Sequence, residues 1–395
     1  MEQWQKVSIA VLSAAALGLA IFSVGYSLGD KGSGARLLGD TVEDEDGFNV
    51  VREAFGKIRE SAVDPPGRDE LAHGAVKGMI RVLNRGDDPY ALFYTPSGYQ
   101  SFQELTSGRF SGIGVWLKQK GEDLEVVSVL PSTPAREAGL ERGDIVEEID
   151  GRAVAEMNVD EAVALIKGLP GTEVALTLSR DGAPRSFTIT RESIELPNLE
   201  ARVTSEDLGY IRLLGFARGA GNQLRSEVSE LSEAGAEGIV LDLRDNGGGL
   251  FSEGIDVASV FIDDGRIVSY KARSEPERVY EAEGQAFESI PLVVLVNEGT
   301  ASASEIVAGA LQDRDRAIVV GETTYGKGSV QEVFPLADAS ALKLTTGAYF
   351  TPGGRNISGK GIEPDVEVDS TRTAQRERAV EILKGIVLST SGAQG

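Results

Sequence analysis

Apolar residues follow different spacings in successive stretches of the chain, and each spacing predicts a different kind of segment. Residues 7–28 carry no charge, and this run is long enough to cross a bilayer, since a crossing helix needs about 20 residues. Residues 47–84 instead place apolar side chains three and four positions apart, as in Phe48, Val51 and Phe55. This spacing predicts amphipathic helices, the second of which is expected over residues 70–83.

Residues 108–192 change to short β-rich runs separated by turn residues, with one helix among them that carries Val159, Val163 and Ile166 on one face. Residues 208–349 then alternate buried strands with helices, a pattern that predicts parallel strands joined by right-handed crossovers. Sites in such sheets gather at the carboxyl ends of the strands. A charged amphipathic helix is expected over residues 371–388, followed by a disordered tail at 389–395.

These changes of pattern divide the chain into seven segments. We expect a cytoplasmic stub (1–6), a transmembrane anchor (7–28), a linker (29–45), an N-terminal helical region (46–104), a small β-rich domain (105–193), an α/β core (194–368), and a C-terminal helix with its tail (369–395).

The charges around residues 7–28 predict an orientation for the anchor. Lys6 precedes the run and a cluster of acidic residues follows it, so the positive-inside rule keeps the N-terminus in the cytoplasm and sends the rest across. The expected location is a bacterial cytoplasmic membrane, with the folded part on the extracytoplasmic, periplasmic side. The alternative is a cleaved signal peptide, although no small-x-small cleavage site stands out.

Composition excludes several classes of function. The formal net charge is −23, which argues against a nucleic-acid partner, because phosphate binding needs clustered Lys and Arg. The chain has no Cys, which excludes disulfides and thiolate metal sites. Neither a metal nor a cofactor is expected. The single histidine, His73, lies in the N-terminal helical region and is given no role.

Candidate chemistry begins where the apolar run 291–296 meets the sequence Asn297-Glu-Gly-Thr-Ala-Ser-Ala-Ser-Glu305. A buried strand, a sharp turn and a helix start coincide there at Ser302, which is where a nucleophile would lie. The structural alternative is a helix cap, because Ser302 and Glu305 have the spacing of a capping box. Local sequence alone favours the cap.

A serine nucleophile in this chain would need a base other than histidine, and Lys327 lies between two glycines downstream. Free lysine has a pKa near 10.4, so the amine accepts a proton at pH 7 only if its pKa falls by about 3 pH units. Burial can lower a lysine pKa that far, provided that no carboxylate is paired with the amine. Gln331 is neutral and can hold the amine, if the glycines bend the chain between them.

The β-rich segment resembles a PDZ domain. The resemblance rests on Ser111-Gly-Ile-Gly114, Pro134-Ala-Arg-Glu-Ala-Gly-Leu140, Gly143-Asp-Ile-Val146 and Asp150-Gly151. It implies that a peptide tail adds to the strand that begins near Ile113 and Val115, that the N–H groups of the glycine turn bind its carboxylate, and that its last apolar side chain lies against the helix. The implied peptide-binding residues are Gly112, Ile113, Gly114, Val115, Val159, Val163 and Ile166.

Most of the chain beyond the anchor is similar to the C-terminal processing peptidases, serine endopeptidases with a Ser–Lys dyad and an inserted PDZ domain. The motifs that carry this similarity are Leu241-Asp-Leu-Arg-Asp-Asn-Gly-Gly-Gly-Leu-Phe251, Val296 to Ile306, Gly321-Glu-Thr-Thr-Tyr-Gly-Lys-Gly328 with Gln331, and Gly361-Ile-Glu-Pro-Asp365.

The similarity assigns a role to each site residue: Ser302 is the nucleophile, Lys327 the general base and Gln331 its orienting partner, while the N–H groups of Gly248 and Ala303 form the oxyanion hole. It implies a crotonase-like α/β core with a parallel or mixed sheet and an inserted α+β PDZ domain, and a PDZ domain that gates the site, for which Lys167 is a coupling candidate. Asp242 and Arg244 are expected to support the glycine turn.

The function expected from these features is a membrane-anchored endopeptidase that recognises substrate C-termini and cleaves the tail through an acyl-enzyme. Its partners would be proteins or peptides with free apolar C-termini and the membrane, with a homodimer left open. The alternative is a catalytically inactive PDZ scaffold that binds protein C-termini. A Ser–His–Asp protease is excluded because His73 lies in the wrong region.

Overall fold

The computed structural model describes residues 45–86, 88–120, 123–157, 159–273, 275–369 and 371–392. The predicted anchor at residues 7–28 and nearly all of the predicted linker lie outside these residues. Within the described part of the chain, no helix combines the length and apolar character that a membrane crossing requires.

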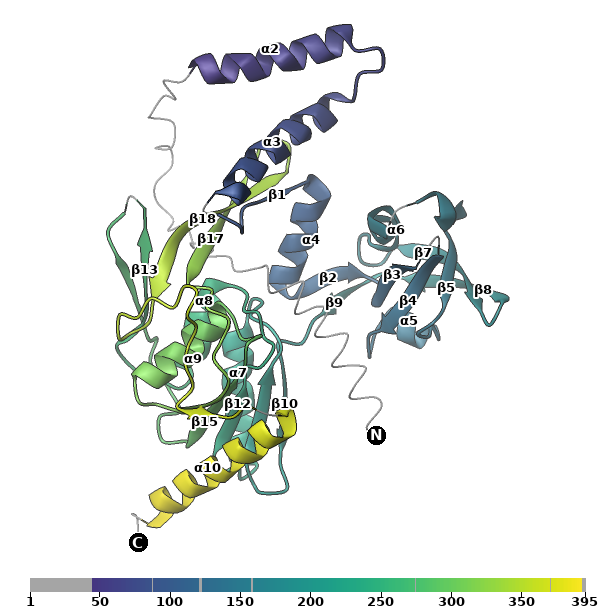
Figure 1. Ribbon diagram of the computed structural model, residues 1–395. Coiled ribbons are helices and arrows are strands. Elements are labelled where there is room, and N and C mark those ends of the chain that lie inside the picture. The colour runs from purple at the N-terminus through teal and green to yellow at the C-terminus, as the bar shows by residue number, and fades with distance from the viewer. Residues whose placement is uncertain are drawn as a thin grey trace.

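The described part of the chain begins with two helices, of which the first stands away from the rest and the second packs against the strand that follows it (Figure 1). Helices α2 (Glu45–Ser61) and α3 (Arg68–Arg85) lead to a short strand, β1 (Leu92–Tyr94), and then to α4 (Pro96–Ser107). The predicted helical spacing of this region is therefore confirmed, and Val51 is among several exposed apolar side chains on these helices.

A separate β-rich unit follows, attached to the core through the ribbon of β2 (Arg109–Gly112) and β9 (Glu192–Glu195) (Figure 1). Its main sheet has the order β3-β4-β5-β7-β8, with β6 paired to β5. Its elements are β3 (Val115–Lys120), β4 (Asp123–Val129), α5 (Pro134–Glu137), β5 (Ile145–Ile149), β6 (Arg152–Ala153), the 3-10 turn η1 (Val154–Glu156), α6 (Val159–Ile166), β7 (Glu173–Arg180) and β8 (Ala183–Thr190). It has a hydrophobic core of its own.

The larger sheet of the core confirms the predicted βα alternation. Strands β11 (Gly209–Leu213), β12 (Ile239–Asp242), β15 (Leu292–Val296), β16 (Ile318–Gly321) and β19 (Val366–Glu367) are parallel neighbours in that order, and β10 (Leu199–Val203) adds an antiparallel edge. Every residue of β15 is buried, as expected for a strand covered on both faces.

Helices cover both faces of this sheet (Figure 1). On one face, α7 (Ala220–Glu233), α8 (Phe251–Ser259) and α9 (Ala303–Asp313) bury their apolar sides together with alternate strand residues. On the other face, α10 (Arg372–Gly392) packs Ala379 and Leu383 against Val293 and Leu295. The expectation of a disordered tail from Ser389 was wrong for residues 389–392, because α10 continues to Gly392.

A second sheet was not predicted, and it connects the N-terminal region to the core. It has the order β1-β18-β13-β14, with β17 also paired to β18. Its members besides β1 are β13 (Arg266–Ala272), β14 (Arg278–Glu281), β17 (Ser329–Pro335) and β18 (Ala341–Phe350). Because β1 and β17 flank the same strand, the segment before β1 lies near the residues that precede β17.

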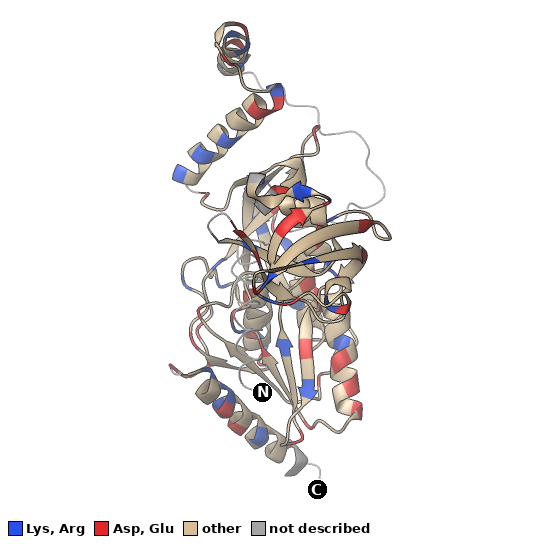
Figure 2. Cartoon of the chain, turned by 90° about the vertical axis from the view of Figure 1, so that its right-hand side faces the viewer, with Lys and Arg blue, Asp and Glu red and all other residues tan. Residues whose placement is uncertain are grey.

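Figure 2 shows that positions of Lys and Arg and positions of Asp and Glu are distributed over the helices and strands of the described residues.

Candidate active site

The candidate residues meet at one edge of the larger sheet. Gly248 lies on the turn after β12, Ser302 on the turn after β15, and Lys327 on the loop between β16 and β17. The register pairs Asp242 of β12 with Leu295 of β15, so both strands end at the same level. The carboxyl ends of neighbouring parallel strands therefore bring these three turns together, which the alternation of strands and helices predicted for the glycine turn and the serine turn.

Ser302 has a backbone conformation that L-residues rarely adopt. Its φ is 59° and its ψ is −117°, at the N-cap of α9, a state that costs on the order of 1–3 kcal/mol unless its surroundings hold it. The side chain is almost fully buried. The Tyr349 hydroxyl donates to the Ser302 carbonyl at 3.1 Å, and the Glu305 carboxylate accepts from the Ser302 N–H at 2.8 Å.

The carboxylate of Glu305 ties the serine turn to the lysine loop. One oxygen accepts from the N–H groups of Ser302 and Lys327, at 2.8 and 2.9 Å, and the other accepts from the Gly326 N–H at 2.7 Å and from the Thr324 hydroxyl. Glu305 is fully buried. Burial raises its pKa, while these four hydrogen bonds act in the opposite direction. The predicted cap is thus also the connection between nucleophile and base.

Lys327 meets the requirement that the sequence set for a lysine base. Its side chain is 1% exposed. Burial, together with the positive charge of Lys343, lowers the pKa of Lys327 to about 7, although the charge of Glu305 acts in the opposite direction. A lysine with this pKa is about half neutral at pH 7, whereas free lysine is almost entirely charged.

The Lys327 amine is not yet hydrogen-bonded to its expected partners. Among the described residues, its Nζ has no hydrogen-bond partner, and it lies 4.9 Å from the centre of the Tyr90 ring. The Gln331 amide nitrogen donates to Ser329 Oγ at 2.9 Å and to Thr345 Oγ1 at 3.3 Å. Gln331 therefore lies buried beside the loop, but the hydrogen bond to the amine that its expected role requires is not formed.

The two expected oxyanion donors lie close together. Gly248 has a φ of 91°, and a Cβ on it would lie 2.8 Å from the Ala303 nitrogen and 2.9 Å from Ser302 Cβ, so only glycine allows this approach. Ala303 is the first residue of α9, where an N–H has no partner within the helix. The Gly248 N–H donates to Asn246 Oδ1 at 2.9 Å, and it must leave this acceptor to bind an oxyanion.

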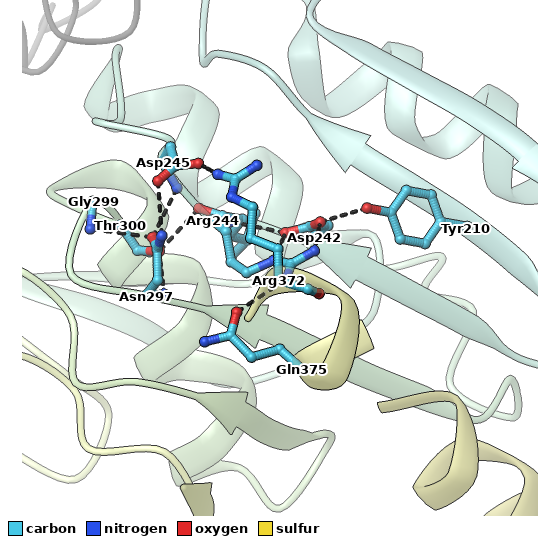
Figure 3. A network of polar contacts seen from close by, with 10 residues as sticks. Tyr210, Asp242, Arg244, Asp245, Asn297, Gly299, Thr300, Arg372 and Gln375 are labelled. Carbon is cyan, nitrogen blue, oxygen red and sulfur yellow. Dashed lines mark hydrogen bonds and ion pairs between the residues drawn. The ribbon is translucent and has the colours of Figure 1, made fainter. Parts of the chain in front are cut away.

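A polar network, partly buried, holds both turns in place (Figure 3). Asn297 donates to Asp245 at 2.7 Å and accepts from its N–H at 2.8 Å, which joins the serine turn to the glycine turn. Arg372, at the start of α10, forms an ion pair with Asp245. The Asn246 amide group donates to the Leu213 carbonyl at 2.8 Å. The turn is thus held by neighbours from three parts of the core.

Asp242 and Arg244 support the glycine turn, as expected (Figure 3). Their side chains form a buried ion pair at 2.6 Å, and Arg244 also donates to the side chain of Gln375 at 3.0 Å. Burial acts to raise the pKa of Asp242, but hydrogen bonds and the charge of Arg244 hold it below its usual range. Tyr210 donates to the same carboxylate.

The candidate peptide-binding residues occupy different positions in the β-rich unit. Strand β3 is an edge strand of its sheet and lies beside α6. Val115 on β3 and Val163 on α6 are partly exposed, whereas Ile113 and Ile166 are buried in the core of the unit.

The remaining candidates of this set are two glycines and the first residue of α6. Gly112 pairs with Glu192 at the end of β2. Gly114 has a φ of 89° and contacts Thr133 closely. Val159 begins α6. Strand β3 and helix α6 are therefore neighbours, while Ile113 contributes packing.

Lys167, the coupling candidate, joins the two units. Its amine lies 2.5 Å from a carboxylate oxygen of Glu104 on α4 and 3.4 Å from Ser101 Oγ. The end of α6 thus contacts the helix that follows β1.

Sequence reasoning missed three residues around the lysine. Tyr90 and Lys343 belong to the N-terminal segment and to β18, which join the site only through the second sheet. Lys343 is fully buried, and burial lowers its pKa to about 8, with Asp88 acting in the opposite direction. Tyr349 also comes from β18. The alternating apolar pattern of these strands carried no signal for this role.

Comparison with known proteins gives consistent matches. Residues 207–368 match Peptidase family S41, and residues 125–180 match the PDZ domain. The carboxy-terminal processing protease CtpA of Bacillus subtilis is 35% identical over 365 residues, which cover 92% of this chain and 76% of that protein. A carboxyl-terminal-processing protease of Synechocystis is 37% identical over 369 residues, which cover 89% and 85% of the two chains.

Among solved structures, a photosystem II D1 C-terminal processing protease is 33% identical, with a TM-score of 0.47, over 83% of this chain and 89% of that chain.

Replacing Lys327 with methionine should stabilise the fold at low pH. The folded-state pKa of about 7 lies below the unfolded value near 10.4, so the lysine destabilises the fold fully below pH 7 and not at all above about pH 10.5. We expect Lys327→Met to raise the free energy of unfolding by roughly 2–4 kcal/mol at pH 6, with the difference vanishing near pH 10.5.

Urea unfolding at pH 6, 8 and 10.5 measures this difference. The exposed Lys360 serves as the control, because Lys360→Met should change stability by less than about 0.5 kcal/mol at every pH. A Lys327→Met variant no more stable than the parent at pH 6 would contradict the burial of a cation at this position.

Proposed function

This chain belongs to peptidase family S41, with carboxy-terminal processing serine proteases as its relatives, and we propose that it cleaves protein tails with a Ser302–Lys327 dyad. The observation that carries the proposal is the buried lysine with a pKa near 7, tied through Glu305 to a serine at the start of a helix. A lysine with a purely structural role has no need of a lowered pKa, whereas a general base does.

The reaction follows from the positions of these groups. The neutral Lys327 amine takes the proton of Ser302 Oγ as that oxygen attacks the substrate carbonyl carbon. The resulting oxyanion is stabilised by the N–H groups of Gly248 and Ala303, with the positive end of the α9 dipole behind them. The lysine ammonium then protonates the leaving amine, and the acyl group stays on Ser302 as an ester.

Deacylation uses the same base a second time. Lys327, neutral again, takes a proton from a water molecule that attacks the ester, and then returns that proton to Ser302 Oγ. For the first step the amine must move from the Tyr90 ring to the serine, with Gln331 as the neutral group that orients it. Since guanidinium does not release its proton, arginine cannot replace this lysine.

Recognition of the substrate is assigned to the PDZ domain. Strand β3 offers an unpaired edge beside α6, to which a tail can add as a further strand. The N–H groups around Gly112 and Gly114 would bind the terminal carboxylate, and the partly exposed Val115 and Val163 would contact an apolar last residue. The substrates are therefore proteins or peptides with free apolar C-termini.

The alternative, an inactive PDZ scaffold, accounts less well for the core. An inactive scaffold does not explain the lowered pKa of Lys327 or the unusual backbone conformation of Ser302. Both features cost stability, and a binding module that uses only its PDZ domain would lose nothing by replacing them.

We further propose that residues 7–28 anchor the protein in the bacterial cytoplasmic membrane, with the catalytic part on the periplasmic side. The uncharged run and the charges on either side of it support this location.

Ser302→Ala and Lys327→Arg should each lower kcat/KM for a peptide with an apolar C-terminus by at least about a thousandfold. The first variant lacks the nucleophile, and the second carries a group that does not accept the proton. Product mapping by mass spectrometry measures the loss, and unchanged urea unfolding of Ser302→Ala shows that the fold is intact. Cleavage by Ser302→Ala at the parental rate would remove the nucleophile assignment.

Amidation of the substrate C-terminus should lower kcat/KM by about 10- to 100-fold, the equivalent of a charge-assisted hydrogen bond. A Val163→Glu variant, with a charge in the proposed groove, supplies the matched control. Amidation should cost that variant little more, because tail binding is already lost. An equal loss in both enzymes, or no loss in the parent, would place recognition elsewhere.

Full-length protein produced in a bacterium should stay in the membrane pellet after an alkaline carbonate wash, whereas a chain that starts at residue 29 should not. Protease added to spheroplasts should degrade the full-length protein, which reports the periplasmic side. If intact mass places the N-terminus of the mature protein beyond residue 28, residues 7–28 belong to a cleaved signal peptide and are not an anchor.

A further inference from the structure

The turn between α3 and β1 reaches the proposed base from a distant part of the sequence. Tyr90 lies on this turn and is partly buried, with its ring centre 4.9 Å from Lys327 Nζ. This distance is within the range of about 6 Å over which an aromatic face attracts a cation. Since no described residue hydrogen-bonds that amine, the ring face is its most direct polar contact in the structure.

Hydrogen bonds fix the turn that carries Tyr90. The Asp88 carboxylate accepts from the Tyr90 N–H at 3.1 Å, and it accepts from the Thr345 N–H and hydroxyl at 2.9 and 2.7 Å. The Thr345 oxygen in turn accepts from the Gln331 amide at 3.3 Å. The turn therefore contacts Lys327 directly through the Tyr90 ring, and it is connected to Gln331 through Thr345.

We propose that Tyr90 is a positioning residue for the catalytic base, whose ring face holds the Lys327 ammonium away from Ser302 between turnovers. This inference rests on the proposed roles of Ser302 and Lys327. It assigns a part in catalysis to the N-terminal segment, which lies outside the core that carries the dyad.

The charges around Lys327 explain why its ammonium needs the contact with the Tyr90 ring. Lys343 on β18 repels the ammonium, while Glu305 on α9 attracts it, and Asp88 on the turn faces Lys343. Burial and the neighbouring Tyr325 raise the pKa of Tyr90 to about 12, so its hydroxyl stays neutral through the working range. The ring therefore favours the charged amine without acting as an anion or as a second base.

Removing the ring should change the titration of the lysine in a defined direction. An aromatic face favours the charged form, so Tyr90→Leu should lower the pKa of Lys327 by roughly half a unit to one unit. The acid limb of the pH profile of kcat/KM should move to lower pH by the same amount. At pH 6 this shift corresponds to an approximately three- to fivefold gain in kcat/KM relative to the value at the pH optimum.

Two isosteric substitutions separate the ring charge from its packing. Tyr90→Phe keeps the ring and should keep the acid limb within about 0.3 units of the parent, while trifluorophenylalanine at position 90 should move it as Tyr90→Leu does, because fluorine withdraws charge from the face. These substitutions keep the proposal testable even if Tyr90→Leu does not fold. A trifluorophenylalanine profile that overlays the phenylalanine profile would overturn the proposal.

The lysine titration is also read without any substrate. Lysine labelled with ¹³C at Cε gives an NMR signal for Lys327, assigned by its loss in Lys327→Arg, and its midpoint should fall in Tyr90→Leu and in the fluorinated protein. If the midpoint moves in a protein that cleaves no peptide, the proposed function fails while the Tyr90 contact stands. If cleavage occurs and the midpoint does not move, the positioning role is wrong.

Discussion

The site depends on one buried carboxylate. Glu305 binds the N–H groups of Ser302, Gly326 and Lys327 at 2.7–2.9 Å, so the serine turn and the lysine loop cannot move independently. These contacts also leave the carboxylate occupied by backbone donors, rather than paired with the lysine amine. A fixed carboxylate of this kind stabilises the strained serine turn and the lysine loop, yet it allows the amine nearby to lose its proton.

The fold around Lys327 makes the charged form of its side chain unfavourable. Burial and Lys343 disfavour the ammonium, and Glu305 and the Tyr90 ring favour it. Burial and the charges of Lys343 and Glu305 leave the pKa of Lys327 at about 7, where both protonation states are populated and a base can act reversibly. The strained backbone of Ser302 is a second cost at the same place. Both costs are offset by the buried sheets around the site, and both agree with the acyl transfer that we propose.

Much of this arrangement could be predicted from sequence, because it depends on local patterns. The alternation of strands and helices predicted that the turns of Gly248 and Ser302 lie at the carboxyl ends of the strands, and the need for a neutral lysine predicted the burial of Lys327. The wider role of Glu305 was missed, since its partners Gly326 and Lys327 lie about 20 residues away and no spacing rule connects them. Tyr90 and Lys343 were missed because the second sheet joins strands from opposite ends of the chain. The contacts of Gln331 depend on Thr345 and Asp88 for the same reason.

The most direct test of the central claim is the pH dependence of covalent modification of Ser302 by a fluorophosphonate, followed by intact mass and peptide mapping. The account predicts a single addition on the peptide that contains Ser302, at a rate that rises through one ionisation near pH 7 and is lost in Lys327→Met. Modification at another residue, or a rate on Ser302 that stays flat from pH 5 to 9, would contradict a serine activated by a neutral buried lysine.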